Sequence, residues 1–179
     1  MIRPARADDL PMLPVIEAAA GEVFRDLGMD AVADDDLPTA EELARFLSVE
    51  GILVAVAVAV AVDDHDRPVA YLLVQALDGW AHVEQVSVHP DHVGNRLGSR
   101  LLDEADAWAD EHDLSGLTLT TFEHVPWNAP YYRRLGFRTI DEADLSVGLR
   151  AIRRTEAARG LDRWTRIVML RSRSNEPSQ

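Results

Sequence analysis

The stretch of residues 84–102 constrains the fold most, because it joins three kinds of local structure in a fixed order. It reads E-Q-V-S-V-H-P-D-H-V-G-N-R-L-G-S-R-L-L. A strand-like run of residues 83–88 is followed by His89-Pro90, then a loop that contains glycine, then a helical pattern. This order places the unpaired backbone N–H groups and the positive dipole of a helix start beside the loop. The stretch therefore predicts an anion site that suits a phosphate.

The composition restricts the classes of partner and of site. The chain has 179 residues, no cysteine and a formal net charge of -13. The length predicts one domain with its own core, which we expect over residues 1–171, with 172–179 as a disordered tail. The excess of carboxylates argues against nucleic acid as a partner, since nucleic acid is bound through Lys and Arg. Without cysteine there are no disulfides, zinc–thiolate sites or cysteine nucleophiles, and we predict no metal site.

Two further patterns concern location. The N-terminal residues Met1-Ile2-Arg3-Pro4 lack the charged-then-apolar pattern of a signal peptide. The longest uncharged apolar run, residues 52–62, is shorter than the ~20 residues that a membrane-spanning helix requires. We therefore expect a cytoplasmic protein with no membrane partner.

Periodicity and turn residues predict a mixed α/β chain. Strands are predicted at residues 2–5, 52–62, 69–77, 80–88, 116–122, 137–140 and 167–170. Helices are predicted from Asp8 or Asp9 to Leu27, from a Thr39–Glu42 capping box to Gly51, and at 97–112, 126–135 and 145–159. The three central strands should form an antiparallel meander, because only short polar turns separate them.

Two motifs stand in order on this framework. V-S-V-H-P-D-H-V-G-N-R-L-G-S-R-L-L, residues 86–102, precedes W-N-A-P-Y-Y-R-R-L-G-F, residues 127–137, with one helix and one strand between them. The pair resembles the GNAT superfamily of acetyl-CoA-dependent N-acetyltransferases, and with the element order the resemblance covers about residues 2–140. It implies a mostly antiparallel sheet of about six to seven strands flanked by helices, with a splay between the strand of residues 83–88 and that of residues 116–122.

The resemblance also implies acetyl-CoA as co-substrate and assigns binding residues to it. The pyrophosphate would be held by the loop and the helix start, which comprise Val93, Gly94, Asn95, Arg96, Leu97, Gly98 and Ser99. The backbone N–H of Val86, Ser87 or Val88 would donate to the thioester carbonyl. Asn128 is expected either to bond the pantetheine arm or to cap the short helix.

The loop departs from the family pattern at two positions. Aligned on Leu97-Gly98, it has Val93 at the first position and Arg96 where the middle glycine belongs. Arginine is able to adopt helical backbone angles, so we expect Arg96 to keep the first helical turn.

Acetyl transfer to an amine requires a base, an oxyanion donor and a proton for the departing thiolate. Glu84, on the strand that enters the loop, is the expected base, directly or through a water; otherwise it is an exposed or ion-paired strand residue. His82 on the same strand face is the rival base. Tyr132 is the expected general acid, because the resemblance places the family's tyrosine there and a phenol is able to donate to sulfur. Its alternative is an aromatic packed in the core, a role that we expect for Tyr131.

The acceptor is expected to be a small amine or a peptide amine, bound between the first two helices and the strand ends. Asp34-Asp35-Asp36 lies in the link between those helices and either favours a cationic acceptor or forms a solvated loop. Residues 141–179 are expected to complete a pocket or to pair with a second copy of the chain as a homodimer.

Two functions fit these patterns, and a third is excluded by them. The first is an N-acetyltransferase that works by direct transfer in a ternary complex. The second is a non-catalytic acyl-CoA-binding module or sensor with a degenerate pyrophosphate loop. A dinucleotide-binding or P-loop protein is excluded, because no G-x-G-x-x-G follows a strand and no G-K-[ST] occurs.

Overall fold

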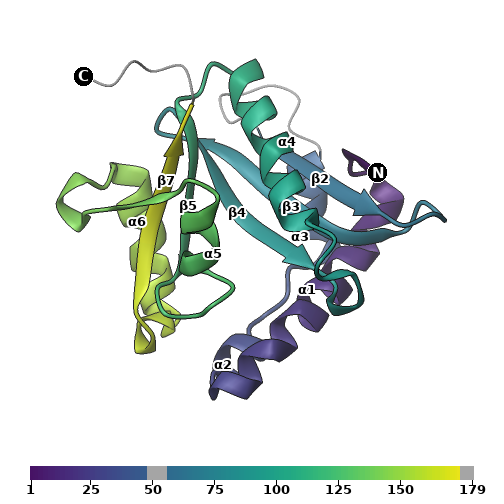
Figure 1. Ribbon diagram of the computed structural model, residues 1–179, viewed down its shortest axis with the longest axis horizontal. Coiled ribbons are helices and arrows are strands. Elements are labelled where there is room, and N and C mark those ends of the chain that lie inside the picture. The colour runs from purple at the N-terminus through teal and green to yellow at the C-terminus, as the bar shows by residue number, and fades with distance from the viewer. Residues whose placement is uncertain (48–55, 174–179) are drawn as a thin grey trace. The chain divides into compact units, whose positions relative to one another are not determined.

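The computed structural model describes residues 1–47 and 56–173, which fall into two compact units (Figure 1). Unit 1 comprises Met1–Val74 and Gln85–Glu104, and unit 2 comprises Gln75–Glu84 and Ala105–Gln179. The predicted helix end at Gly51, residues 52–55 of the predicted second strand and residues 174–179 of the predicted tail lie outside the described residues. A single domain over residues 1–171 stays a prediction.

Seven strands and six α-helices are formed by the described residues. The strands are β1 Ile2–Pro4, β2 Val56–Val62, β3 Pro68–Leu77, β4 Trp80–Val88, β5 Gly116–Phe122, β6 Arg138–Ile140 and β7 Arg166–Ser172. The α-helices are α1 Leu13–Gly21, α2 Asp30–Ala33, α3 Ala40–Leu47, α4 Leu97–Glu111, α5 Ala129–Arg134 and α6 Val147–Ala158. Short 3₁₀ helices are η1 Ala7–Met12, η2 Glu22–Leu27, η3 Pro90–His92, η4 Glu142–Asp144 and η5 Leu161–Arg163.

The strands form one sheet in the order β1-β2-β3-β4-β5-β7-β6. The pairs β1–β2, β5–β7 and β6–β7 are antiparallel, and β4–β5 is parallel. The β4–β5 pairing covers Ala81–Val83 and Leu117–Leu119, although β4 continues to Val88 and β5 to Phe122. This confirms the predicted mixed, mostly antiparallel sheet, and the splay between these two strands stays a prediction.

The first predicted helix is divided into three helical pieces. Pro11 lies inside η1 and Pro14 at the start of α1. Proline has no N–H group to donate within a helix, so the first turns are 3₁₀ in character. Gly28 ends the run with a φ of 68°, as predicted. The acidic link after it contains α2, a single turn too short to give a periodic pattern.

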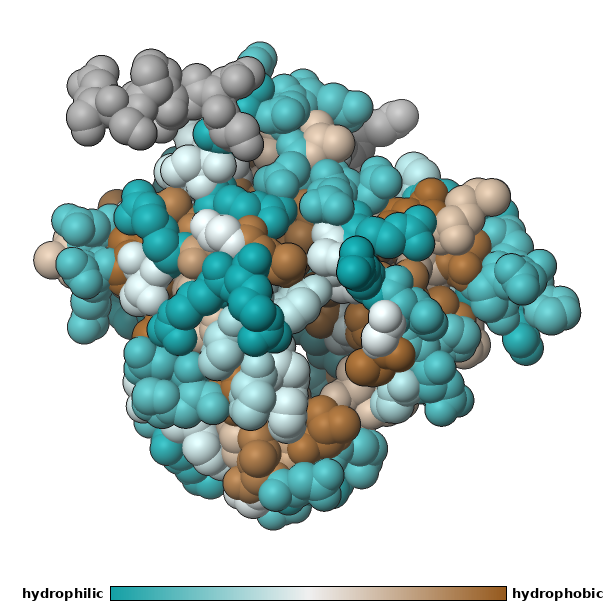
Figure 2. Space-filling view, in the orientation of Figure 1, coloured by the Kyte–Doolittle hydropathy of each residue, from teal (hydrophilic) through white to brown (hydrophobic). Residues whose placement is uncertain are grey.

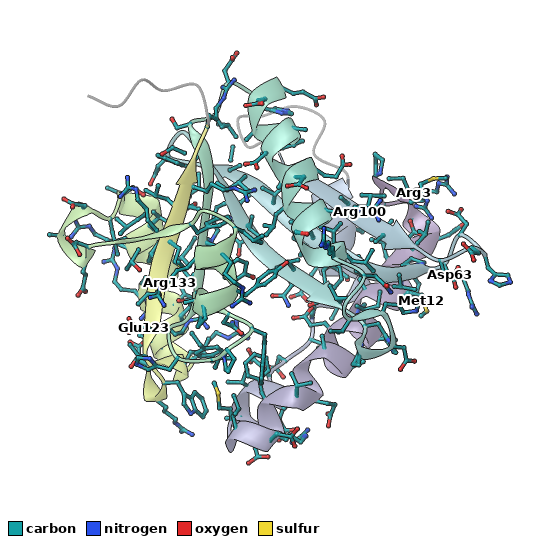
Figure 3. The ribbon with its side chains drawn as sticks, viewed as in Figure 1. Arg3, Met12, Asp63, Arg100, Glu123 and Arg133 are labelled. Atoms are coloured by element: carbon teal, nitrogen blue, oxygen red, sulfur yellow. The ribbon has the colours of Figure 1, made fainter. Side chains whose placement is uncertain are left out.

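Unit 1 packs its helices on the sheet through an apolar cluster. The buried members are Leu10, Leu13, Ile16, Leu43, Val60, Val62, Tyr71 and Leu73. Arg3 adds a polar tie, because it donates to Asp9 at 2.6 Å and to Asp66 at 2.9 Å and so joins β1, η1 and the β2–β3 turn. Figure 3 shows Arg3 and Asp63 of that turn at the same edge of the unit. The predicted capping box is present, since Glu42 accepts the Thr39 N–H at 2.8 Å.

Unit 2 is organised around β5 and the C-terminal helix. Helix α6 lies alongside β7 (Figure 1), and its Leu149 packs with Leu145 and Val168. The Asp78 carboxylate accepts the Gly148 N–H at 2.7 Å, which fixes the start of α6 to the β3–β4 turn. At the start of β5, a Cβ on Gly116 would lie 2.2 Å from the Arg171 carbonyl, so only glycine allows this close approach.

Candidate functional site

The loop between β4 and α4 contains two residues with positive φ, at which the chain changes direction. Gly94 has a φ of 92° and Arg96 a φ of 55°. The expectation of helical angles at Arg96 is therefore wrong, because Arg96 adopts the left-handed conformation that glycine adopts at lower cost. Helix α4 begins only after it, with a first bond from the Arg100 N–H to the Arg96 carbonyl at 3.1 Å.

The start of α4 presents unpaired hydrogen-bond donors. Among the described residues, no hydrogen bond is recorded for the backbone N–H groups of Leu97, Gly98 and Ser99. The Ser99 hydroxyl donates to the Arg96 carbonyl at 2.9 Å, which supports the turn. Arg100, labelled in Figure 3, is exposed in the first turn of this helix. Three free N–H groups at the positive end of a 15-residue helix are suited to an anion.

The other loop residues are open to solvent or form turns. Val93 is 71% exposed, and Gly94 and Asn95 are exposed too. His89 caps η3, because its Nδ1 accepts the Asp91 N–H at 3.3 Å. His89 is thus a turn residue.

We predict that Arg96→Gly stabilises the protein. Relief of the left-handed conformation contributes about 1–2 kcal/mol, and the added freedom of glycine in the unfolded chain costs about 0.5–1 kcal/mol. The free energy of unfolding in denaturant should therefore rise by about 0.5–1 kcal/mol. Arg96→Ala is the matched control, because it removes the same side chain but keeps the strained φ. Equal stability of the two variants would contradict the strain argument.

Glu84, on β4 in unit 2, is an accessible carboxyl group crowded by protein. The Gln75 amide on β3 donates to it. Its side chain is exposed to solvent, yet the protein around it displaces enough water to raise the pKa of the carboxyl above its ordinary value. The Gln75 hydrogen bond opposes this rise, and the charge of Glu156 adds to it. A carboxylate of this kind is a stronger proton acceptor than an ordinary surface glutamate.

His82, the rival base, is enclosed in the core of unit 2. It is 1% exposed, and its Nδ1 lies 3.0 Å from the Thr118 hydroxyl on β5. Burial lowers the pKa of His82 to about 4, although the charge of Glu156 opposes the shift. The imidazole is therefore neutral at pH 7 and closed off from water, which favours Glu84 as the group that exchanges protons.

We predict that this buried histidine makes the protein acid-sensitive. The folded pKa of about 4 lies below the unfolded value of about 6.5, so the unfolded chain binds more protons between them. Stability is then fully present above pH 6.5 and is lost as the pH falls towards 4, by about 2 kcal/mol between pH 7 and pH 5. His82→Gln should remove most of this slope in denaturant unfolding. His65→Gln, at an exposed turn position, should keep it.

Tyr132 lies on α5 between two aromatic rings. It is 9% exposed, with ring centroids 5.5 Å from Tyr131 and 5.6 Å from Phe137, both in edge contacts. Burial raises the pKa of the phenol, and Tyr131 adds to the rise while Arg166 opposes it. No hydrogen bond of the hydroxyl is recorded within the described residues. The phenol is therefore protonated at neutral pH, and its hydroxyl donates to no acceptor within the described residues. Tyr131, expected to be the packed ring, is only half-buried.

Asn128 takes the N-cap position of α5, but its side chain does not cap the helix. Its Nδ2 instead donates to the Thr121 hydroxyl on β5 at 2.8 Å. The capping alternative is therefore wrong for the side chain, and a contact with a pantetheine arm stays a prediction. The tie to β5 nonetheless fixes the start of the helix that carries Tyr132.

The end of β4 belongs to unit 1 and carries Val86, Ser87 and Val88. Val86 and Val88 are half-buried, and Ser87 is 4% exposed with its hydroxyl accepting from Gln85 at 2.8 Å. Ser87 also contacts the buried Tyr71 hydroxyl, which donates to Glu17 on α1. Side-chain hydrogen bonds thus hold the strand at this point.

A charged cluster in unit 2 escaped the sequence-based prediction. Glu156 on α6 accepts hydrogen bonds from Thr120 on β5, Arg166 on β7 and Arg153 on its own helix. Burial alone would raise the pKa of Glu156, but these donors together hold it below its ordinary value. The alternation Thr118, Thr120 marks one face of β5, yet no local signal identifies a partner 36 residues away.

Asp34 of the acidic link is paired with an arginine of its own unit. Arg25 donates to Asp34 at 2.6 Å and to Glu22 at 3.0 Å. The charge of Asp34 is therefore largely offset, which weakens the prediction of a cationic acceptor at this position.

Apolar side chains gather over η2 and α2 in Figure 2, where Val23 and Leu27 are exposed.

Residues 1–47 and 56–173 contain neither a cluster of metal ligands nor a membrane-spanning helix. No group of three or more His, Asp or Glu side chains there is arranged to hold a metal ion. No helix in the same residues is long and apolar enough to cross a membrane.

The chain is similar to known acetyltransferases in sequence pattern and in structure. A model of the acetyltransferase (GNAT) family matches residues 23–137. A GNAT-family acetyltransferase from Staphylococcus aureus Mu50 has 16% identity and a TM-score of 0.69, covering 96% of this chain and 98% of that chain. Ribosomal-protein-alanine N-acetyltransferase from Brucella melitensis has 19% identity and a TM-score of 0.68, covering 97% of this chain and 99% of that chain. PaiA N-acetyltransferase from Thermoplasma acidophilum, in complex with coenzyme A, has 13% identity and a TM-score of 0.63, covering 97% of this chain and 98% of that chain. At these identities the structural likeness shows the fold alone.

Proposed function

The chain belongs to the acetyltransferase (GNAT) family, and we propose that it is an N-acetyltransferase that moves an acetyl group from acetyl-CoA to a primary amine by direct transfer in a ternary complex. One observation carries the proposal. Unit 2 combines an accessible carboxyl of raised pKa, Glu84, with a protonated phenol whose hydroxyl is uncommitted, Tyr132. These are the two proton-transfer partners that the reaction needs.

The proposed reaction balances with these two groups. Glu84 takes a proton from the ammonium or the attacking amine, directly or through a water. The amine nitrogen bonds to the thioester carbonyl carbon, and a backbone N–H of Val86, Ser87 or Val88 donates to the oxyanion. The C–S bond then breaks, and Tyr132 donates its proton to the thiolate. Solvent returns a proton to the Tyr132 phenolate and takes the proton from Glu84, and it also takes the second nitrogen proton when the acceptor enters as an ammonium. Amide and free thiol leave together, and no covalent acyl-enzyme forms.

The proposed role of the loop is to hold the pyrophosphate of acetyl-CoA. The free N–H groups of Leu97, Gly98 and Ser99 support it, because they are donors at the positive end of α4. The proposal extends to Val93, Gly94, Asn95 and Arg96 as the lining of this loop. PaiA from Thermoplasma acidophilum, which has the same fold, was crystallised with coenzyme A.

The proposed acceptor is a small amine or a peptide amine. Among proteins of this fold, those from Brucella melitensis and Escherichia coli are ribosomal-protein-alanine N-acetyltransferases. A panel that includes alkyl amines, amino acids and peptides with a free N-terminal alanine therefore tests the substrate class directly.

Thermal shift with acetyl-CoA followed by a thiol-release assay tests the function. The absence of cysteine gives that assay no background from the protein. We expect binding of acetyl-CoA and turnover with at least one class of amine. Binding without turnover on any amine would favour the second candidate, an acyl-CoA-binding module, which the strained Arg96 in place of a glycine supports. Absence of binding would remove both candidates.

A further inference from the structure

A second carboxylate lies beside Glu84 on the same face of unit 2. The β4–β5 register pairs His82 with Thr118 and Val83 with Leu119. One step further, Glu84 corresponds to Thr120, and alternation puts both on the face of His82 and Thr118. The Glu156 carboxylate accepts a hydrogen bond from the Thr120 hydroxyl. The Glu156 carboxylate is thereby held at Thr120, on the sheet face to which Glu84 also belongs.

Glu156 is fixed there by two arginines. The Arg166 Nη2 lies 2.6 Å from its Oε1 and 3.0 Å from the Thr120 hydroxyl, and Arg153 holds its other oxygen. Arg166 and Glu156 have side chains only 10% and 13% exposed. The Arg166 Nε is buried with no hydrogen-bond partner among the described residues; Nη2 donates to Glu156 and Thr120, and the guanidinium lies over the Phe122 ring at 4.5 Å. The carboxylate is thus ordered and ionised rather than mobile.

We propose that Glu156 is a positioning residue that acts through Glu84, because the Thr120–Glu156–Arg166 cluster fixes a negative charge beside Glu84 and makes Glu84 a stronger base. This inference rests on the proposed function, in which Glu84 takes the proton. It gives α6 and β7, which no motif marked, a defined part in the chemistry. The negative charge of Glu156 raises the pKa of both Glu84 and His82, in agreement with this placement.

Glu84 itself is hydrogen-bonded to the Gln75 amide from β3. The other polar groups of this face and of the cluster are the neutral His82 from β4, the Thr120 hydroxyl from β5, Glu156 and Arg153 from α6 and Arg166 from β7. Only Glu156 carries a negative charge in this set. Its removal should therefore lower the pKa of Glu84, whereas loss of the Gln75 hydrogen bond should raise it.

Titration of ¹³C-labelled glutamate carboxyls by NMR tests the inference, with Glu84→Gln used to assign the Glu84 signal. In the unmodified protein, Glu84 should titrate above its ordinary range; a value at or below that range would overturn the inference without any cluster variant. In Glu156→Gln the Glu84 pKa should fall by about one pH unit, because a like charge is removed. Arg166→Gln should move it upward, since Glu156 then loses a countercharge.

Asp162→Asn is the matched control. Asp162 is bonded to Arg153 at 2.6 Å in the same network but makes no contact with Thr120, so the Glu84 titration should not change. The acid limb of kcat/KM against pH should follow the NMR titration in each variant. If the NMR titration moves and the rate profile does not, Glu156 sets the pKa of Glu84 but Glu84 is not the base, and the positioning role of Glu156 falls together with that base role. An unmoved Glu84 signal in Glu156→Gln overturns the inference while the rate profile still tests the proposed function.

Discussion

Replacing Glu84 by Gln is expected to lower kcat about 10³-fold, because loss of a positioned general base typically costs 10²–10⁴ in rate. The amide keeps the size of the side chain and its hydrogen bond to Gln75, so the fold should be unaffected. The acid limb that Glu84 sets should disappear. The residual rate should then follow the neutral fraction of the amine, which rises tenfold per pH unit up to about pH 10. Initial rates of thiol release from pH 5 to pH 10 measure both effects.

The KM for acetyl-CoA should not change in this variant, since Glu84 is not among the residues proposed to hold the co-substrate. Glu111→Gln, at an exposed position near the end of α4, is the control for loss of one surface carboxylate and should retain the full rate. A Glu84→Gln enzyme with an unchanged pH profile would assign the base role elsewhere, and burial makes His82 a poor replacement.

Most of the secondary structure could be predicted because its signals are local. The bounds of Trp80–Val88 and Gly116–Phe122 match the prediction residue for residue. In both strands apolar and polar residues alternate, and turn residues bound each strand, so the periodicity and the turn signals predict the same element. The Thr39–Glu42 capping box is likewise a contact between residues three apart. Such features depend on neighbours in the sequence and need no knowledge of the packed structure.

Features that depend on distant residues could not be predicted. The conformation of Arg96 is imposed by the loop against the local preference of arginine, and nothing in the sequence forces it. Burial of His82 arises from its pairing with Thr118 on another strand. The choice between Tyr131 and Tyr132 as the buried ring follows from the orientation of α5, a helix too short to show a periodic face.

The C-terminal segment illustrates the same limit. Residues 141–179 carry no motif, yet β7 is inserted between β5 and β6, and α6 brings Glu156 to the face of Glu84. Strand order within a sheet is a long-range property, so the sequence pattern predicted β7 but not its place. The segment is therefore an integral part of unit 2, while pairing with a second copy stays a prediction.

Tyr132→Phe is expected to lower kcat about 10²-fold with little change in stability. The substitution removes only the hydroxyl and keeps the ring between Tyr131 and Phe137. Since no hydrogen bond of that hydroxyl is recorded within the described residues, the melting temperature should stay within about a degree or two of the parent value, as expected for a change below ~0.5 kcal/mol. Tyr131→Phe is the matched control and should retain the rate.

If Tyr132 is the general acid, the rate lost in Tyr132→Phe should depend on the pKa of the leaving thiol. A thiolate of low pKa departs without a proton, so an aryl thioester donor should restore most of the rate lost in Tyr132→Phe. With acetyl-CoA the deficit should remain, because an alkyl thiol has a pKa near ~8.5 and needs the proton more. Comparing the two donors in single-turnover assays separates proton donation from packing. An equal deficit with both donors would mean that Tyr132 orders the site rather than protonating sulfur.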